Sequence, residues 1–222
     1  MKNLQIHIEI SSKLYLKNPD SSELGRKIVS RSIEMINELG FETFTFKKLG
    51  ERIESPESSI YRYFENKHTL LIYLVSWYWS WIEYQLVFAT INIDSPIEKL
   101  RKSINILVQP TNADLPTTYI DEILLSNIIV TESVKAYHTK DVDDENEKGF
   151  FKTYKQVVQR VSNMVLEVNR EFECPHMLIS TVIEGAHQQK FFAKHLPGLT
   201  DTEKGTDTIA QFYTDMVLKV VG

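Results

Sequence analysis

The chain has 222 residues, enough for one large domain or for a small domain followed by a larger one. Hydrophobic residues make up 42% of it and charged residues 25%, which fits a globular protein and excludes a disordered one. The formal net charge is −5, and the single cysteine, Cys174, excludes a disulfide framework within the chain. We therefore expect a reducing, cytoplasmic location.

The first residues contain no unbroken apolar run of the kind that a secretory signal needs. Residues 4–10 alternate apolar and polar side chains, which predicts a short strand. This strand could pair with its copy in a second subunit, but we favour an N-terminal arm over residues 1–19. The most membrane-like stretch, residues 70–88, contains Glu83 and several tyrosines, so we expect a buried helix and no membrane partner.

After Pro19 the apolar spacing predicts helices only. Four polar residues are expected to cap the first four helices by accepting a backbone N–H with their side chains: Asp20, Thr45, Ser55 and Asn66. Gly40 should end the first helix, because glycine tolerates the left-handed conformation, and Pro56 suits the first position of the third. Further stretches of helical length are 96–109, 117–138, 144–172, 176–195 and 205–221. The predicted fold class is all-α, with about nine helices.

Residues 57–64 have the features of a helix that enters the DNA major groove. Ile60 and Phe64, four residues apart, give this segment an apolar back that can pack on the two preceding helices. Around them lie side chains that can contact bases or phosphates. The expected DNA-binding residues are Thr45, Lys47, Lys48, Ser58, Ser59, Tyr61, Arg62, Tyr63 and Lys67.

Here the sequence resembles the tetracycline-repressor (TetR) family. The resemblance covers about fifty residues and rests on a glycine-terminated helix, an apolar-small pair, a tyrosine–phenylalanine core and a lysine followed by paired leucines: Gly40, Thr45, Leu49, Gly50, Ile60 to Phe64, Asn66, Lys67, Leu70 and Leu71. It implies a three-helix DNA-binding domain over residues 20–71. It also implies a helical effector-binding and dimerisation domain over residues 72–222. The partners would be double-stranded DNA, a small-molecule effector and a second copy of the chain.

Three positions depart from the family pattern. Glu54 stands where glycine is usual, Pro56 where serine is frequent, and Glu57 where a basic or small residue is common. Residues 21–70 contain eight lysines and arginines and eight acidic residues, so the segment has no net charge. DNA-binding surfaces are generally basic. An alternative function is therefore a helical adaptor of the same fold that has lost DNA binding.

The C-terminal part offers two weaker predictions. An aromatic stripe on the fourth helix could line a ligand pocket or could simply be core: Trp77, Trp81, Tyr84 and Phe88. The last two long helices, where the family forms its dimer, carry an apolar seam: Leu178, Val182, Phe191, Ile209, Phe212, Met216 and Val220.

An enzyme is a less favoured alternative. Helical bundles can hold two metal ions with Glu-x-x-His pairs, and this spacing occurs three times: Glu65 with His68, Glu173 with His176, and Glu184 with His187. Only the last pair falls inside a predicted helix. The sequence contains no nucleophile elbow, phosphate-binding loop or dinucleotide fingerprint. We therefore expect no catalytic residues, no metal and no cofactor.

Overall fold

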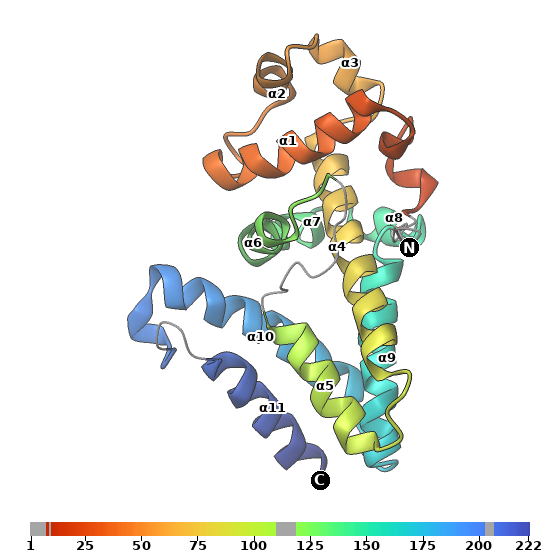
Figure 1. Cartoon of the computed structure of the whole chain (residues 1–222), viewed down its shortest axis with the longest axis vertical. Helices are drawn as coiled ribbons and strands as arrows, with labels where there is room; N and C mark the ends of the chain where they lie inside the picture. The colour runs from red at the N-terminus through yellow and green to blue at the C-terminus, as the bar shows by residue number, and fades with distance from the viewer. Residues whose placement is uncertain (1–7, 9, 110–118, 203–206) are drawn as a thin grey trace, which may run out of the picture. The chain divides into compact units, whose positions relative to one another are not determined.

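A computed structural model describes residue 8 and residues 10–109, 119–202 and 207–222. Within these ranges the regular structure is helical, with no strand (Figure 1). The predicted all-α class is confirmed. Residues 1–7 and 9 lie outside the described residues, and with them most of the predicted strand.

The first four α-helices follow two short 3-10 helices. In chain order these elements are η1 (Ser12–Leu14), η2 (Pro19–Ser21), α1 (Glu23–Leu39), α2 (Phe46–Ile53), α3 (Glu57–Tyr61) and α4 (Lys67–Thr90). Gly40 ends α1 with a φ of 76°, as its position in the sequence predicts. Thr45 caps α2, and Asn66 accepts the Thr69 N–H at 2.9 Å.

Two of the predicted caps are wrong. Ser22, and not Asp20, caps α1 by accepting the Gly25 N–H, because Pro19 starts a separate 3-10 helix that contains Asp20. Ser55 does not cap α3, since Pro56 occupies the cap position and the helix has no side-chain cap.

The remaining helices are more numerous than predicted, because two expected helices are each broken. They are α5 (Pro96–Val108), α6 (Glu122–Glu132), α7 (Val134–Tyr137), α8 (Val142–Glu147), α9 (Lys152–Val168), α10 (Pro175–His195), η3 (Pro197–Leu199) and α11 (Thr208–Val221). A corner at Ser133 separates α6 from α7. Gly149, with a φ of 83°, lies in the turn between α8 and α9.

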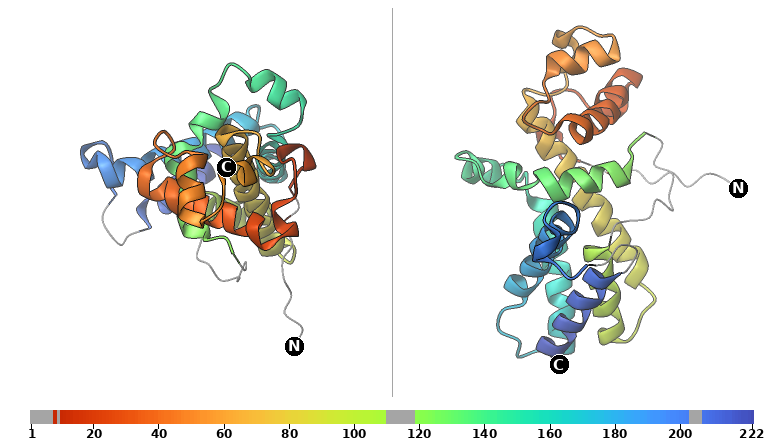
Figure 2. Two further views of the ribbon diagram at one scale, coloured as in Figure 1. Left: turned by 90° about the horizontal axis from the view of Figure 1, so that it is seen from above. Right: turned by 90° about the vertical axis from the view of Figure 1, so that its left-hand side faces the viewer.

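The helices form two compact units. One comprises Met1–Ser80 with Thr111–Lys152, and the other Trp81–Pro110 with Thr153–Gly222. In the first unit, α1 packs against η2, α2 and α6, and α2 packs against α3 (Figure 1). In the second unit, α5, α10 and α11 pack against one another (Figure 2). Arg160 of α9 donates through Nε to Glu83, in the C-terminal half of α4, at 2.8 Å.

The N-terminal segment that we expected as an arm is packed where the structure describes it. Ile8, Ile10 and Leu14 are buried, and the Leu16 N–H donates to the Tyr63 carbonyl oxygen at 2.8 Å. The Lys13 ammonium donates to the Lys148 carbonyl oxygen at 3.3 Å. This segment is therefore held in place by Lys148 and Tyr63, two residues of the first unit.

Candidate DNA-binding surface

Helix α2 provides the support for the DNA-binding segment. The Thr45 hydroxyl accepts the Lys48 N–H at 3.2 Å, which fixes the first turn. Phe46, Leu49 and Ile53 are buried on one face of the helix, as their spacing requires. Thr45, Lys47 and Lys48 lie on the exposed side, where DNA-contacting residues were predicted.

The turn between α2 and α3 is tight and has an unusual residue. A Cβ atom on Gly50 would lie 2.7 Å from the Ser55 carbonyl oxygen, which is too close for a side chain. The turn can therefore pack against α2 only because residue 50 is a glycine. The Ser55 N–H donates to the Gly50 carbonyl oxygen at 2.9 Å. Glu54 ends α2 in the left-handed region, with a φ of 56° and a ψ of 44°. Glycine is the usual residue for that conformation.

Glu54→Gly is therefore expected to stabilise the protein by about 0.5–1 kcal/mol, because glycine adopts the left-handed conformation without the steric cost that glutamate bears. It also removes a negative charge beside α3. Glu54→Gln separates these effects, since it removes the charge but keeps the strained conformation. Urea unfolding should show a higher midpoint for the glycine variant alone. A glycine variant less stable than the wild type would contradict this assignment.

Helix α3 presents a mixed polar and aromatic surface. Ile60 is fully buried, whereas Tyr61 is 47% exposed and its ring packs edge-on against Phe46, with the centroids 5.1 Å apart. The Tyr61 hydroxyl donates to the Glu57 carboxylate at 3.3 Å. Ser58 and Arg62 are exposed and Ser59 is partly exposed. Four predicted contact residues on α3 or at its end are therefore exposed or partly exposed: Ser58, Ser59, Tyr61 and Arg62.

Two predicted contact residues have other roles. Tyr63 is 1% exposed, and its hydroxyl forms a 2.7 Å hydrogen bond with the Ser22 hydroxyl, so the expectation that it faces DNA is wrong. The Lys67 ammonium turns toward the loop between α1 and α2, where it donates to three carbonyl oxygens at 3.0–3.3 Å, those of Phe41, Glu42 and Phe44. Lys67 therefore orders this loop.

The basic residues of the segment are unequally available to a phosphate. Of the eight in residues 21–70, Arg26, Lys27, Lys48 and Lys67 donate to backbone carbonyl oxygens, and Arg31 and Arg52 are paired with carboxylates. The hydrogen bond from Arg52 lowers the pKa of Glu38. Lys47 and Arg62 are exposed and form no hydrogen bond or ion pair within the described part of the chain. Their charge can therefore be directed at DNA, although the segment is neutral overall.

Helices α6 and α7 contact the end of α1 and the loop between α1 and α2 through hydrogen bonds and ion pairs. Asn37 of α1 donates to the Leu124 carbonyl oxygen at 2.7 Å, and the Phe41 N–H donates to the buried Glu132 carboxylate at 3.1 Å. The Lys135 ammonium lies 2.7 Å from Glu132 and 3.1 Å from Glu42. Partial burial opposes the charged form of Lys135, but the bonds to these two carboxylates raise its pKa overall. The sequence analysis assigned no role to Glu132 or Lys135, because their partners are distant in the chain.

Residues 28–74 match the family model for bacterial regulatory proteins of the tetR family. The chain carries the DNA-binding domain of the tetR family. The resemblance seen in the sequence is thus confirmed for the N-terminal DNA-binding domain of the tetR family. No curated protein sequence matches the chain.

Solved structures of similar fold include a tetR-family regulatory protein and two further proteins, AibR and FadR. AibR, in a complex with isovaleryl coenzyme A and operator DNA, aligns with a TM-score of 0.60 and 15% identity over 86% of this chain and 97% of AibR. A tetR-family regulatory protein from Rhodococcus RHA1 aligns with a TM-score of 0.62 and 13% sequence identity. The alignment covers 90% of this chain and 98% of that protein. The fatty acid degradation regulator FadR from Bacillus halodurans aligns with a TM-score of 0.61 and 13% sequence identity. The alignment covers 96% of this chain and 97% of FadR. At these identities the likeness is one of fold.

The four residues of the predicted aromatic stripe differ in their exposure. Trp77 and Trp81 are buried, as the core alternative predicts. Tyr84 is partly exposed and stacks on Phe88, with ring centroids 6.1 Å apart, and Phe88 is 73% exposed. The assignment of these four residues to an effector pocket stays a prediction that only a bound ligand can test.

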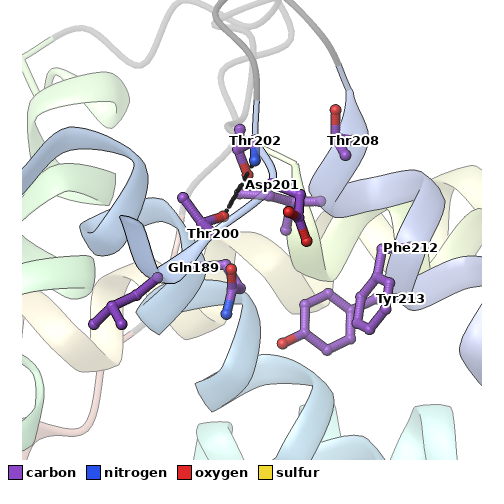
Figure 3. Close-up of a pocket in the computed structure, with 9 residues that line it drawn as sticks. Gln189, Thr200, Asp201, Thr202, Thr208, Phe212 and Tyr213 are labelled. Atoms are coloured by element: carbon purple, nitrogen blue, oxygen red, sulfur yellow. Dashed lines mark hydrogen bonds between the residues drawn. The ribbon is translucent and has the colours of Figure 1, made fainter. Parts of the chain in front are cut away.

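A small cavity lies in the second unit between α10, the loop after η3, and α11 (Figure 3). Its volume is about 180 Å³, below the 300–1,000 Å³ of typical small-molecule sites. The hydroxyls of Thr200 and Thr202 are hydrogen-bonded at 2.9 Å on one side of it, with Gln189 and Tyr213 on another. Ile209 and Phe212, predicted for the dimer interface, also line this cavity. Its size does not suit a bulky effector.

The predicted dimer seam is only partly available to a partner. Val182 is fully buried within the subunit, so its assignment to the seam is wrong. Phe212 and Val220 are 58% and 53% exposed on α11. The others are partly exposed: Leu178, Phe191, Ile209 and Met216.

The three Glu-x-x-His spacings do not form metal sites. His68 binds the Glu145 carboxylate at 2.8 Å, and His176 binds Gln159 at 2.9 Å. Glu184 is exposed and accepts from the Tyr154 hydroxyl, whereas burial lowers the pKa of His187 to about 3 and keeps that ring neutral. Among the described residues no three potential ligands group together. Nor does a described helix have the length and apolar character to cross a membrane.

Proposed function

We propose that this tetR-family regulator is a ligand-responsive repressor that binds a palindromic operator as a homodimer. The observation that carries the DNA-binding part is the surface of α3, where Tyr61 and Arg62 are exposed over a buried back at Ile60. The N-terminal residues of such a helix contact base edges, and flanking cations bind phosphates. Thr45 and Lys47 at the start of α2 offer further donors.

The proposal of a dimer rests on the exposed apolar side chains of α11. A two-fold dimer presents two copies of α3, and a palindromic operator presents two equivalent half-sites. Proteins of similar fold support the proposal of an effector, since AibR was solved with isovaleryl coenzyme A and operator DNA. An effector that binds more tightly to a dimer whose two α3 helices are spaced differently would shift the population away from the DNA-bound form.

Arg62→Ala is expected to weaken operator binding about tenfold and to reduce the salt slope of the binding constant by about one, because it removes one phosphate-directed cation. The measurement is fluorescence anisotropy with DNA from upstream of the protein's own gene, at several salt concentrations. Arg31→Ala is the matched control, since Arg31 is an exposed arginine on α1 that is already paired with Glu34. Equal affinity of the Arg62 variant and the wild type would show that the contact surface is misplaced.

A specific observation favours one alternative. Glu57 keeps a carboxylate on α3 within hydrogen-bonding distance of Tyr61, and Glu54 adds another in the preceding turn. A helical adaptor without DNA binding would retain such charges. It would show no salt-dependent binding to any DNA tested, whereas a phosphate-binding regulator loses affinity steeply as salt rises.

A further inference from the structure

The segment before α1 lies against the C-terminal end of α3. The Leu16 N–H donates to the Tyr63 carbonyl oxygen at 2.8 Å, just past the last residue of α3. Leu14 on one side and Pro19 on the other are buried, so the stretch between them is anchored at both ends. Lys17 is exposed within this stretch. Its position is therefore fixed relative to α3, although it precedes the residues that match the tetR-family model.

Lys17 lies over the ring of Tyr63, and Arg62 is the residue that precedes Tyr63 in the chain. The Lys17 ammonium lies 5.1 Å from the centroid of the Tyr63 ring. Burial by itself raises the pKa of the Tyr63 hydroxyl, but the hydrogen bond with Ser22 and the nearby positive charges of Lys17 and Arg62 bring it below its ordinary value. Both charges that act on this hydroxyl are positive. Lys17 and Arg62 thus place two cationic residues beside Tyr63, at the end of α3, in a part of the chain where residues 21–70 carry no net charge.

This spot matters because few cations of the segment are available. Six of the eight basic residues in 21–70 are engaged with carbonyl oxygens or carboxylates, which leaves Lys47 and Arg62. Lys17 lies outside that segment; its ammonium contacts the ring of Tyr63 and forms no ion pair with an acid in the described part of the chain. A phosphate between Lys17 and Arg62 would accept hydrogen bonds from an ammonium and a guanidinium, both charge-assisted.

We propose that Lys17 is a phosphate-contacting residue of the DNA interface and acts together with Arg62 on one backbone phosphate. This assignment rests on the proposed DNA binding. It extends the interface to the N-terminal segment, which contributes charge without entering a groove. The backbone hydrogen bond between Leu16 and Tyr63 fixes the distance between the N-terminal segment and the end of α3, and so it positions Lys17 near Arg62.

The test compares two lysines of the same segment. Lys17→Ala is expected to weaken binding to the upstream DNA about three- to tenfold and to reduce the salt slope by about one, while Lys17→Arg keeps both near the wild type. Lys13→Ala is the control, because the Lys13 ammonium is exposed but donates to the Lys148 carbonyl oxygen. Its affinity should stay within about twofold of the wild type.

The outcomes separate this inference from the proposed function. If Lys17→Ala binds like the wild type at every salt concentration while Arg62→Ala is weakened, the inference is overturned and DNA binding stands. If the two lysine variants are weakened equally, the effect is one of general charge, and the specific contact is overturned. A wild-type protein without salt-dependent DNA binding overturns both proposals. Thermal unfolding of each variant shows whether the fold is retained.

Discussion

Gly25→Ala is expected to destabilise the protein by about 3 kcal/mol, because the added methyl group would collide with fixed backbone. A Cβ atom at this position in the first turn of α1 would lie 2.3 Å from the Pro19 carbonyl oxygen and 2.7 Å from the Pro19 Cα. No side-chain rotation relieves this contact, so η2 or α1 must move. The better helix propensity of alanine, worth about 1 kcal/mol, does not offset the collision.

Urea unfolding followed by circular dichroism measures the loss in stability. Gly198→Ala is the matched control, since nothing lies within 4 Å of a Cβ atom built there. That variant should remain within about 0.5 kcal/mol of the wild type. DNA binding should also fall in Gly25→Ala, because η2 connects Lys17 to α1. Equal stability of the two variants would mean that Pro19 is not held where the structure places it.

Phe212→Glu is expected to abolish dimerisation at micromolar concentration. Ile209, Phe212, Met216 and Val220 recur every three or four residues and so form one stripe along α11, with Phe212 its most exposed large side chain at 58%. Burying a carboxylate in an apolar seam, with loss of an aromatic anchor, should raise the dimer dissociation constant by about 100-fold or more. A monomer carries only one copy of α3, so affinity for the operator should fall together with dimerisation.

Light scattering at several concentrations reports the mass directly, and anisotropy reports operator binding. Gln211→Glu adds the same charge at an adjacent exposed position outside the stripe, and should leave the dimer intact. The proposed seam is refuted if Phe212→Glu stays dimeric, and the proposed homodimer is refuted if the wild type is monomeric.

Local signals account for what could be predicted from the sequence. The end of α1 at Gly40, the start of α2 after Thr45 and the cap at Asn66 depend on the backbone and side-chain preferences of residues close in sequence. The burial of Ile60 and Phe64 follows from their spacing on one helix face. The segment that matches the tetR-family model could therefore be located from the sequence.

Errors arose where a distant partner decides the role of a side chain. Tyr63 and Lys67 have the polarity of phosphate contacts, but Ser22 binds the first, and carbonyl oxygens between Phe41 and Phe44 bind the second. Val182 fits the seam by spacing and is buried within its own subunit. Spacing along a helix identifies an apolar face, but it does not say which neighbour covers that face.

The bonds that α6 and α7 make to the α1–α2 corner limit how the DNA-binding segment can be reused. A chimera that joins residues 20–71 to the body of another regulator would leave the Phe41 N–H without Glu132 and would leave Asn37 without the Leu124 carbonyl oxygen. A buried donor that loses its partner costs about 1–3 kcal/mol. The transferable module is therefore discontinuous in sequence and includes α6 and α7. Genetic exchange between regulators would conserve function best when its crossovers keep these two parts together.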